Sequence, residues 1–111
     1  IASRSTTTCM LGQEKVLPLS LIVNEVVTNA VKYAHPSGVA GRVDVFFDSP
    51  DGVRAVLVIA DDGVGFPEGF DPVLQGGLGF RVIRALCEQL GGVHRFESGP
   101  LGVVFRLEMS A

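Results

Sequence analysis

The chain has 111 residues, 47% of them hydrophobic, and a formal net charge of -3 at pH 7. This length supports one domain with its own core and is too short for two ordinary domains, so we expect a single domain over residues 1–111. The nine lysines and arginines are scattered along the chain, which disfavours a nucleic-acid-binding surface. A polyphosphate ligand remains compatible with this charge, because it needs only a few cations and backbone N–H groups.

The start of the chain and its cysteines bear on its setting. The sequence begins at Ile1 without an initiator methionine, so we expect a fragment of a longer protein. Cys9 and Cys87 form no CxxC pair, which disfavours a zinc site and a disulfide framework and favours reduced thiols, buried or incidental. No long apolar run or signal peptide is present. We therefore expect a soluble, cytoplasmic domain, although the full-length protein could be anchored to a membrane.

The first half of the chain predicts a strand, a helix and a hairpin. In chain order these are residues 1–10, Pro18 to Ala34, 42–48 and 53–61. The helix is placed by Pro18, because proline is tolerated near a helix start, and by the His-Pro-Ser-Gly sequence at 35–38, which stops a helix. Ser-Pro-Asp-Gly at 49–52 is a turn sequence, so the two strands around it are expected to form a hairpin.

The second half predicts a loop, a helix and a closing hairpin. Residues 61–77 contain five glycines and two prolines, as a loop does. The next segment has apolar residues at helical spacing and ends at Gly91-Gly92, which favours a helix. The apolar positions are Leu78, Val82, Ile83, Leu86 and Leu90, and the last two strands are expected at 94–98 and 102–109. This order predicts an α+β fold, with helices on one face of a mixed, mostly antiparallel sheet.

A narrow polar stripe runs along the first predicted helix. At about 100° per residue, Glu25, Asn29 and Lys32 fall on one line. The opposite side carries Leu19, Val23, Val27, Ala30 and Val31, and the stripe is flanked by Leu21, Ile22 and Tyr33. An ordinary solvated face would explain the stripe. Its mixed chemistry favours a ligand instead, because carboxylate and amide oxygens suit Mg²⁺ and an ammonium suits phosphate.

Two glycine-rich loops supply the other candidate site residues. In DDGVGF (61–66), Asp61 ends a strand and can accept a hydrogen bond from a ligand amine, while Gly63 and Gly65 permit close approach. In GGLGF (76–80), glycines open a helix, where unpaired N–H groups can meet phosphates. A plain turn and a plain connection are the simpler interpretations of these two loops.

Other glycine and metal motifs are absent. The third glycine of the Rossmann fingerprint is missing, and the chain contains no GxxxxGK[ST] sequence. The spaced acids of an EF-hand loop, a two-histidine metal spacing and a GxSxG sequence are also missing. These absences disfavour dinucleotide-binding, P-loop, calcium-binding and serine-hydrolase proteins.

Three sequences in order resemble the ATP-binding domain of the GHKL superfamily. They are NEVVTNAVKYA on the first helix, DDGVGFP after a strand and GGLGFRVIRALCEQLGG at the second helix. This superfamily contains sensor histidine kinases, DNA gyrase B, mismatch-repair ATPases and certain chaperones. The resemblance spans residues 17 to 106 and is greatest to bacterial two-component histidine kinases with a short nucleotide lid. It implies a two-layer α/β sandwich of the Bergerat type that binds ATP and Mg²⁺.

The resemblance also implies roles for particular residues. Asn29 would coordinate Mg²⁺, and Glu25 would help place the metal or an attacking group. Lys32 would contact phosphate and Tyr33 would line the nucleotide pocket. Asp61 would bind the adenine amine. The glycines and one leucine would shape the pocket and border the lid: Gly63, Gly65, Gly77, Leu78 and Gly79.

The implied function is phosphoryl transfer from ATP to a histidine on a separate dimerisation domain. That domain would lie upstream, the full-length protein would be a homodimer, and a response regulator would receive the phosphate. Neither His35 nor His94 lies in an acceptor-like helix, so we expect both to be non-catalytic. Phe66 and Phe70 are candidates for the family's phenylalanine motif, and Val103 follows Gly102 where relatives often carry threonine.

Three alternatives stay open at this point. A serine kinase of the anti-sigma type shares the fold and phosphorylates a partner protein. A degenerate relative would keep the fold as a scaffold without ATP. A gyrase-like ATPase would use Glu25 as the general base, although the short chain leaves little room for the other elements of such enzymes.

Overall fold

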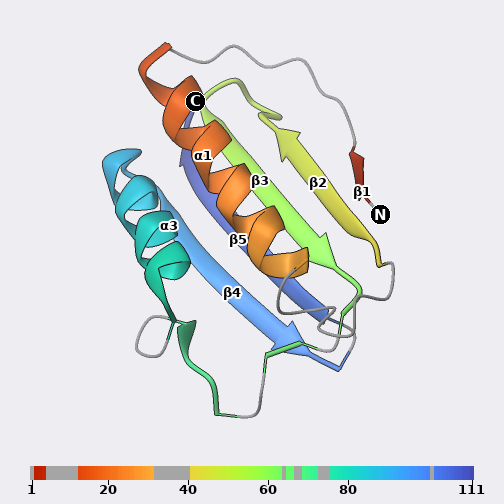
Figure 1. Ribbon diagram of the computed structural model, residues 1–111. Coiled ribbons are helices and arrows are strands. Elements are labelled where there is room, and N and C mark those ends of the chain that lie inside the picture. The colour runs from red at the N-terminus through yellow and green to blue at the C-terminus, as the bar shows by residue number, and fades with distance from the viewer. Residues whose placement is uncertain are drawn as a thin grey trace.

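The computed structural model describes residues 2–4, 13–31, 41–63, 65–66, 69–72, 76–100 and 102–111. In chain order these residues form β1 (Ala2–Arg4), α1 (Gln13–Asn29), β2 (Val43–Asp48), β3 (Arg54–Asp61), α3 (Leu78–Gln89), β4 (Val93–Gly99) and β5 (Gly102–Ser110). The strands make one sheet in the order β1-β2-β3-β5-β4 (Figure 1). β1 pairs parallel to β2 and the other pairs are antiparallel. The predicted mixed, mostly antiparallel sheet is therefore confirmed.

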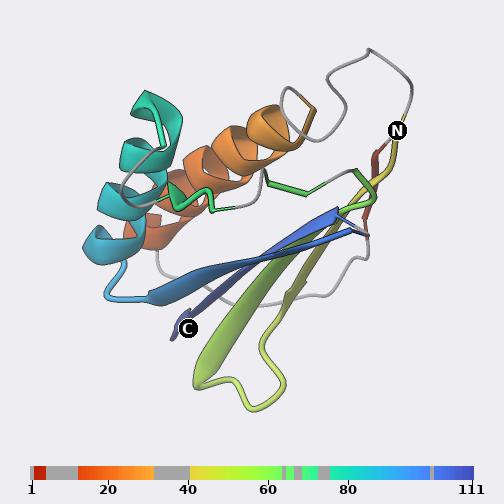
Figure 2. The same cartoon turned by 90° about the horizontal axis from the view of Figure 1, so that it is seen from below.

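Both helices lie on the same face of the sheet, so the molecule has two layers (Figure 2). Alternate residues of the central strands point toward the helices, because successive side chains of a strand face opposite sides. Leu57 pairs with Leu107 and Ile59 with Phe105 across the β3–β5 register, and all four are buried. From the helices, Ile22 and Ile83 enter the same core and are fully buried. Burying each such side chain contributes about 2 kcal/mol.

The first helix begins earlier than the sequence predicted. α1 starts at Gln13, so Pro18 lies inside the helix rather than at its first turn. Proline has no N–H to donate, yet its buried ring packs in the core. The early turns are held from outside, because Lys15 Nζ donates to the carbonyl oxygens of Ser110 at 2.9 Å and Ala111 at 3.1 Å. The predicted end at Ala34 lies outside the described residues.

Two residues expected on apolar helix faces are exposed instead. Val31 was expected on the apolar side of α1 and is 52% exposed, whereas Ile22, expected to flank the polar stripe, is buried in the core. On α3, Leu78 was counted with the apolar face and is 76% exposed, while Phe80 and Cys87 are buried there. Helical spacing locates a face only approximately, and the neighbouring elements decide which side chains it buries.

The second helix ends where its glycines predicted. Gly91 adopts φ +67°, its N–H donates to the Glu88 carbonyl, and the N–H of Gly92 donates to the Cys87 carbonyl. This is the Schellman arrangement, in which a left-handed glycine satisfies the last carbonyls of a helix. β4 begins directly after this turn. No helix in the described part of the chain is long and apolar enough to cross a membrane.

Candidate functional site

The site is built around Asp61, the last residue of β3. Its Oδ1 accepts one hydrogen bond from the N–H of Gly63 at 2.9 Å and a second from the N–H of Val103 at 3.1 Å. Within the described residues, Oδ2 has no hydrogen-bond partner. The carboxylate is therefore held in place by one oxygen, and the other oxygen remains able to accept a bond from a ligand.

The contact between Asp61 and β5 depends on a glycine. Gly102 adopts φ +122° and lies against the backbone of Asp61. A Cβ at this position would collide with the Asp61 carbonyl oxygen and lie 2.8 Å from its Oδ1. Only glycine combines this backbone angle with this approach. The sequence analysis noted Gly102 only for the residue that follows it.

The loop after Asp61 is fixed to the last residues of β4. The N–H of Phe66 donates to Ser98 Oγ at 2.7 Å. Gly65, at φ +79°, leaves no room for a Cβ, which would collide with the Gly99 carbonyl oxygen. Gly63 and Gly65 are both buried in this loop. Ser98 could not be found from the sequence, because nothing local distinguishes it from any serine near the end of a strand.

Glu25 and Asn29 of α1 meet the start of α3. A Cβ added to Gly79 would lie 3.2 Å from Glu25 Oε2, 3.2 Å from Asn29 Oδ1 and 3.3 Å from Asn29 Nδ2. Glycine thus lets the first turn of α3 come against the two polar side chains. This convergence joins two of the predicted sequences, one on each helix. Lys32 and Tyr33, the other predicted residues of α1, lie outside the described residues.

The start of α3 is open on its other side. Gly77 is the N-cap residue, with φ -79° and ψ -161°, and no side chain caps the helix there. A Cβ on Gly77 would meet nothing within 4 Å. The exposed side chain of Leu78 points away from the core. These two predicted residues border the site without contacting Glu25 or Asn29.

A small cavity connects the two halves of the site. Its volume is about 30 Å³. Asn29 and Asp61 both line it, together with Gly65, Phe66 and apolar side chains from the core. Three phenylalanines form much of its wall: the ring of Phe66 lies 5.9 Å from those of both Phe80 and Phe96. This volume is about a tenth of the roughly 300 Å³ at which small-molecule sites begin, so the cavity holds only part of a ligand of that size.

The polar groups of the site fit a Mg²⁺ ion that carries phosphate. The Nδ2 atom of Asn29 is buried and has no hydrogen-bond partner among the described residues, so it could donate to a ligand oxygen. Glu25 and Asn29 would offer two oxygen atoms to Mg²⁺, which in such sites takes one or two protein ligands plus phosphates and water. Among the described residues, no three His, Cys, Asp or Glu side chains lie together as ligands for one metal ion. A Mg²⁺ site of this kind does not need such a group, because phosphates and water complete the coordination.

The described cysteine is excluded as a nucleophile. Cys87 is free and fully buried in α3, and burial raises its pKa to about 12. A thiol with this pKa is protonated at neutral pH and inert. This confirms the buried, reduced thiol expected for Cys87, whereas Cys9 lies outside the described residues.

Comparison with known proteins places this chain in a family. The family of histidine kinase-, DNA gyrase B- and HSP90-like ATPases matches residues 14–111. Blue-light-activated histidine kinase 2 of Erythrobacter litoralis is 31% identical over 91 residues, which are 82% of this chain and 26% of that protein. The nitrate/nitrite sensor protein NarQ of Escherichia coli is 35% identical over 95 residues, 86% of this chain and 16% of that protein.

Solved structures show the same architecture. The histidine kinase domain of the EL346 blue-light activated histidine kinase from Erythrobacter litoralis superposes with a TM-score of 0.89 and 28% identity, covering 97% of this chain and 53% of that one. Full-length ShkA in complex with AMPPNP superposes with a TM-score of 0.72 and 26% identity, covering 99% and 25%. The chain thus spans about a quarter of the length of Blue-light-activated histidine kinase 2.

Proposed function

The chain belongs to the family of histidine kinase-, DNA gyrase B- and HSP90-like ATPases, and we propose that it is the Mg-ATP-binding catalytic domain of a sensor histidine kinase. In this function it binds ATP and presents the γ-phosphate to a histidine on a separate dimerisation domain of the full-length homodimer. A response regulator then receives the phosphate. The observation that carries the proposal is the convergence of Glu25 and Asn29 on Gly79, beside a cavity that ends at Asp61.

Asp61 binds the adenine base in this proposal. Its Oδ1 is occupied by two backbone N–H groups, so Oδ2 is the oxygen that accepts the exocyclic amine. A carboxylate only accepts hydrogen bonds, and this matches an amine that only donates. Gly63 and Gly65 keep the loop close to the base, and Phe66 moves to widen the cavity.

The phosphates lie between α1 and the start of α3. Asn29 and Glu25 hold Mg²⁺ through their oxygens, and the ion when bound neutralises charge on the phosphate oxygens. The unpaired N–H groups at the start of α3 face the phosphates, where Gly77 and Gly79 allow approach and Leu78 borders the lid. We assign a phosphate contact to Lys32 and a nucleotide contact to Tyr33.

The chain's own residues act by position and charge. Phosphoryl transfer needs little covalent chemistry from the protein, because most of the catalysis comes from orienting the reactants and stabilising charge. The acceptor histidine belongs to another part of the full-length protein. The chain alone is therefore expected to bind nucleotide without phosphorylating itself, and a phosphorylated histidine on it would contradict this function. AMPPNP in the ShkA complex is consistent with nucleotide binding by this fold.

The test is a calorimetric titration with a non-hydrolysable ATP analogue, with and without Mg²⁺. Asp61→Asn replaces one accepting oxygen with a donor, so we expect affinity to fall by at least about tenfold. Asp51→Asn is the matched control, because Asp51 also accepts two backbone N–H bonds but lies in the turn before β3. Its affinity should equal that of the wild type.

Three results would count against the proposal or a part of it. If the wild type binds no analogue, the fold serves as a scaffold without ATP. If both variants bind as tightly as the wild type, Asp61 does not hold the adenine. Binding that does not respond to Mg²⁺ would remove the role given to Glu25 and Asn29.

A further inference from the structure

A second and larger cavity lies between α3 and β4. Its volume is about 300 Å³, against about 30 Å³ for the cavity at Asp61. Phe80 and Phe96 line both cavities, with ring centroids 5.5 Å apart in an edge-to-face arrangement. The two rings therefore form a shared wall. Volumes of about 300 Å³ are at the lower end of the range for small-molecule sites.

The other wall of this cavity carries an excess of hydrogen-bond donors. Arg81 and Arg84 line it from successive turns of α3. Glu88, the acid that lines it, is paired with Arg84, whose Nε lies 3.2 Å from Glu88 Oε1. The guanidinium of Arg81 has no ion pair with any residue that the structure describes. One paired carboxylate thus faces two guanidinium groups, each with several donors.

His94 adds a further polar group from β4. Its ring lies edge-to-face with Phe96 at 6.3 Å and makes no hydrogen bond within the described part of the chain. Burial and the nearby charge of Arg84 lower the pKa of His94, so the ring is uncharged at neutral pH. An uncharged imidazole keeps one N–H donor. The cavity therefore combines flat apolar walls with cationic and donor groups on one side.

We propose that this α3–β4 cavity is a second ligand site, which takes a small aromatic anion. The anionic group would pair with Arg81 and Arg84, because guanidinium groups bind carboxylates through two parallel N–H bonds. The ring would pack against Phe80 and Phe96. Since these two side chains also line the cavity at Asp61, a ligand here would restrain them and change nucleotide affinity. This last step rests on the proposed nucleotide-binding function.

The test titrates the chain with benzoate and follows backbone amide shifts by NMR, without nucleotide. Benzamide, which has the same shape and no charge, is the control ligand. We expect benzoate to bind with a dissociation constant on the order of millimolar and to shift residues of α3 and β4. Arg84→Gln should lower the affinity for benzoate by about tenfold. Arg54→Gln, which removes an exposed, ion-paired arginine at the start of β3, should leave benzoate binding unchanged.

A blocking variant separates the site from general effects on folding. Ala85 is exposed on α3 and lines the cavity, so Ala85→Trp should fill it while the circular dichroism spectrum stays native. Equal binding of benzoate and benzamide, or equal losses in Arg84→Gln and Arg54→Gln, would overturn the proposal. So would binding that persists in Ala85→Trp.

Coupling to the nucleotide is measured separately. Saturating benzoate should change the affinity of the wild type for the ATP analogue severalfold, because a ligand that restrains a shared wall couples the two sites. The affinity of Ala85→Trp should stay unchanged, because its filled cavity cannot take benzoate. An unchanged affinity in the wild type would refute the coupling and leave the benzoate site standing. Failure of the analogue to bind at all would refute the proposed function alone, since the benzoate titration contains no nucleotide.

Discussion

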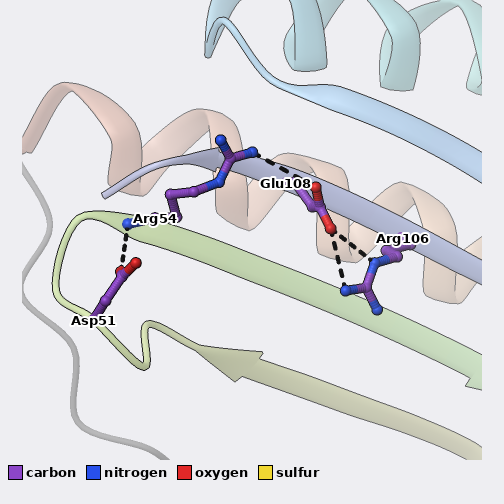
Figure 3. Close-up of polar contacts among 4 residues, drawn as sticks. All are labelled: Asp51, Arg54, Arg106 and Glu108. Atoms are coloured by element: carbon purple, nitrogen blue, oxygen red, sulfur yellow. Dashed lines mark hydrogen bonds and ion pairs between the residues drawn. The ribbon is translucent and has the colours of Figure 1, made fainter.

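The two ends of the strand β3 carry the same local chemistry with different results. Asp51 precedes the strand, and its Oδ1 accepts the N–H group of Val53 at 2.9 Å. The same oxygen accepts the N–H group of Arg54 at 2.8 Å (Figure 3). Asp61 ends the strand and its Oδ1 also accepts two backbone N–H groups. Both aspartates therefore accept two backbone N–H groups with one carboxylate oxygen. Asp61 also lines the cavity described above.

The difference is where the bonds come from. Asp51 bonds only to residues two and three positions later and is exposed. Asp61 bonds to Val103, 42 positions later, and is half-buried. The first bond pattern builds a turn, whereas the second joins two strands and leaves one carboxylate oxygen facing a cavity. Sequence-distant contacts therefore make a site out of a common turn.

The ion pairs toward the Asp51 end of β3 are exposed and constrain the structure only weakly. Glu108 pairs with Arg54 on the neighbouring strand β3 at 3.6 Å and with Arg106 on its own strand β5 at 3.2 Å, and all three side chains are at least 40% exposed (Figure 3). Exposed ion pairs of this kind contribute about 1 kcal/mol or less. Substitutions that break these exposed ion pairs should therefore cost little stability.

The largest difference is expected between two glycines. Gly102→Ala places a Cβ against the Asp61 carbonyl oxygen at φ +122°, and we expect it to lower the free energy of unfolding by about 3 kcal/mol. Gly52→Ala, at φ +71° with no atom within 4 Å of the added Cβ, should cost about 1 kcal/mol for its backbone angle alone. Urea denaturation measures both values. Equal losses of stability in the two variants would mean that the backbone around Asp61 shifts to accept the added Cβ at no extra cost.

A smaller difference is expected between two serines. Ser98→Ala removes the acceptor of the Phe66 N–H, and Ser49→Ala removes a donor to the Arg54 carbonyl at 2.7 Å. Each variant should lose about 1 kcal/mol of stability, the usual value of one hydrogen bond. Only Ser98→Ala should also lower the affinity for the ATP analogue, by roughly fivefold, because it loosens the loop that carries Phe66. Calorimetry on both variants tests this, and equal affinities would remove Ser98 from the site.

The smallest effect concerns acid. The backbone N–H groups of Arg54 and Val53 hold the pKa of Asp51 below its ordinary value of 3.8. A carboxyl whose pKa is lower in the folded state than in the unfolded state stabilises the fold at pH values above the unfolded-state pKa. This contribution is lost as the pH falls through the folded-state pKa. Stability should therefore drop slightly more steeply below pH 3.8 in the wild type than in Asp51→Asn. Urea midpoints measured as the pH is lowered from 5 provide the test, and parallel curves would contradict it.

Much of the fold was predictable because it depends on short-range patterns. The strand at 43–48, the strand at 54–61 and the closing hairpin all lie within one residue of their predicted positions. The Gly91-Gly92 stop is set by backbone angles that only glycine adopts easily. The start of α1 could not be predicted from local sequence, because Lys15 holds it through contacts with residues at the far end of the chain.

The site was predictable in its parts and not in its assembly. Glu25, Asn29 and Gly79 were each singled out by residue type and spacing, and the packing of α1 on α3 brings them together. Ser98 was invisible, since its partner Phe66 lies 32 positions away. The role of Gly102 beside Asp61 was hidden for the same reason.

The sequence by itself determined the kinds of element, their order, the family and the polar groups available for a ligand. These follow from hydrophobic period, turn residues and short motifs, which act within a few positions of the chain. The tertiary structure alone decided that Asp61 reaches β5, that Leu78 faces outward and that Phe80 and Phe96 line two cavities. Strand register and helix packing set these contacts, and both depend on residues that are distant in sequence and meet only in the folded chain.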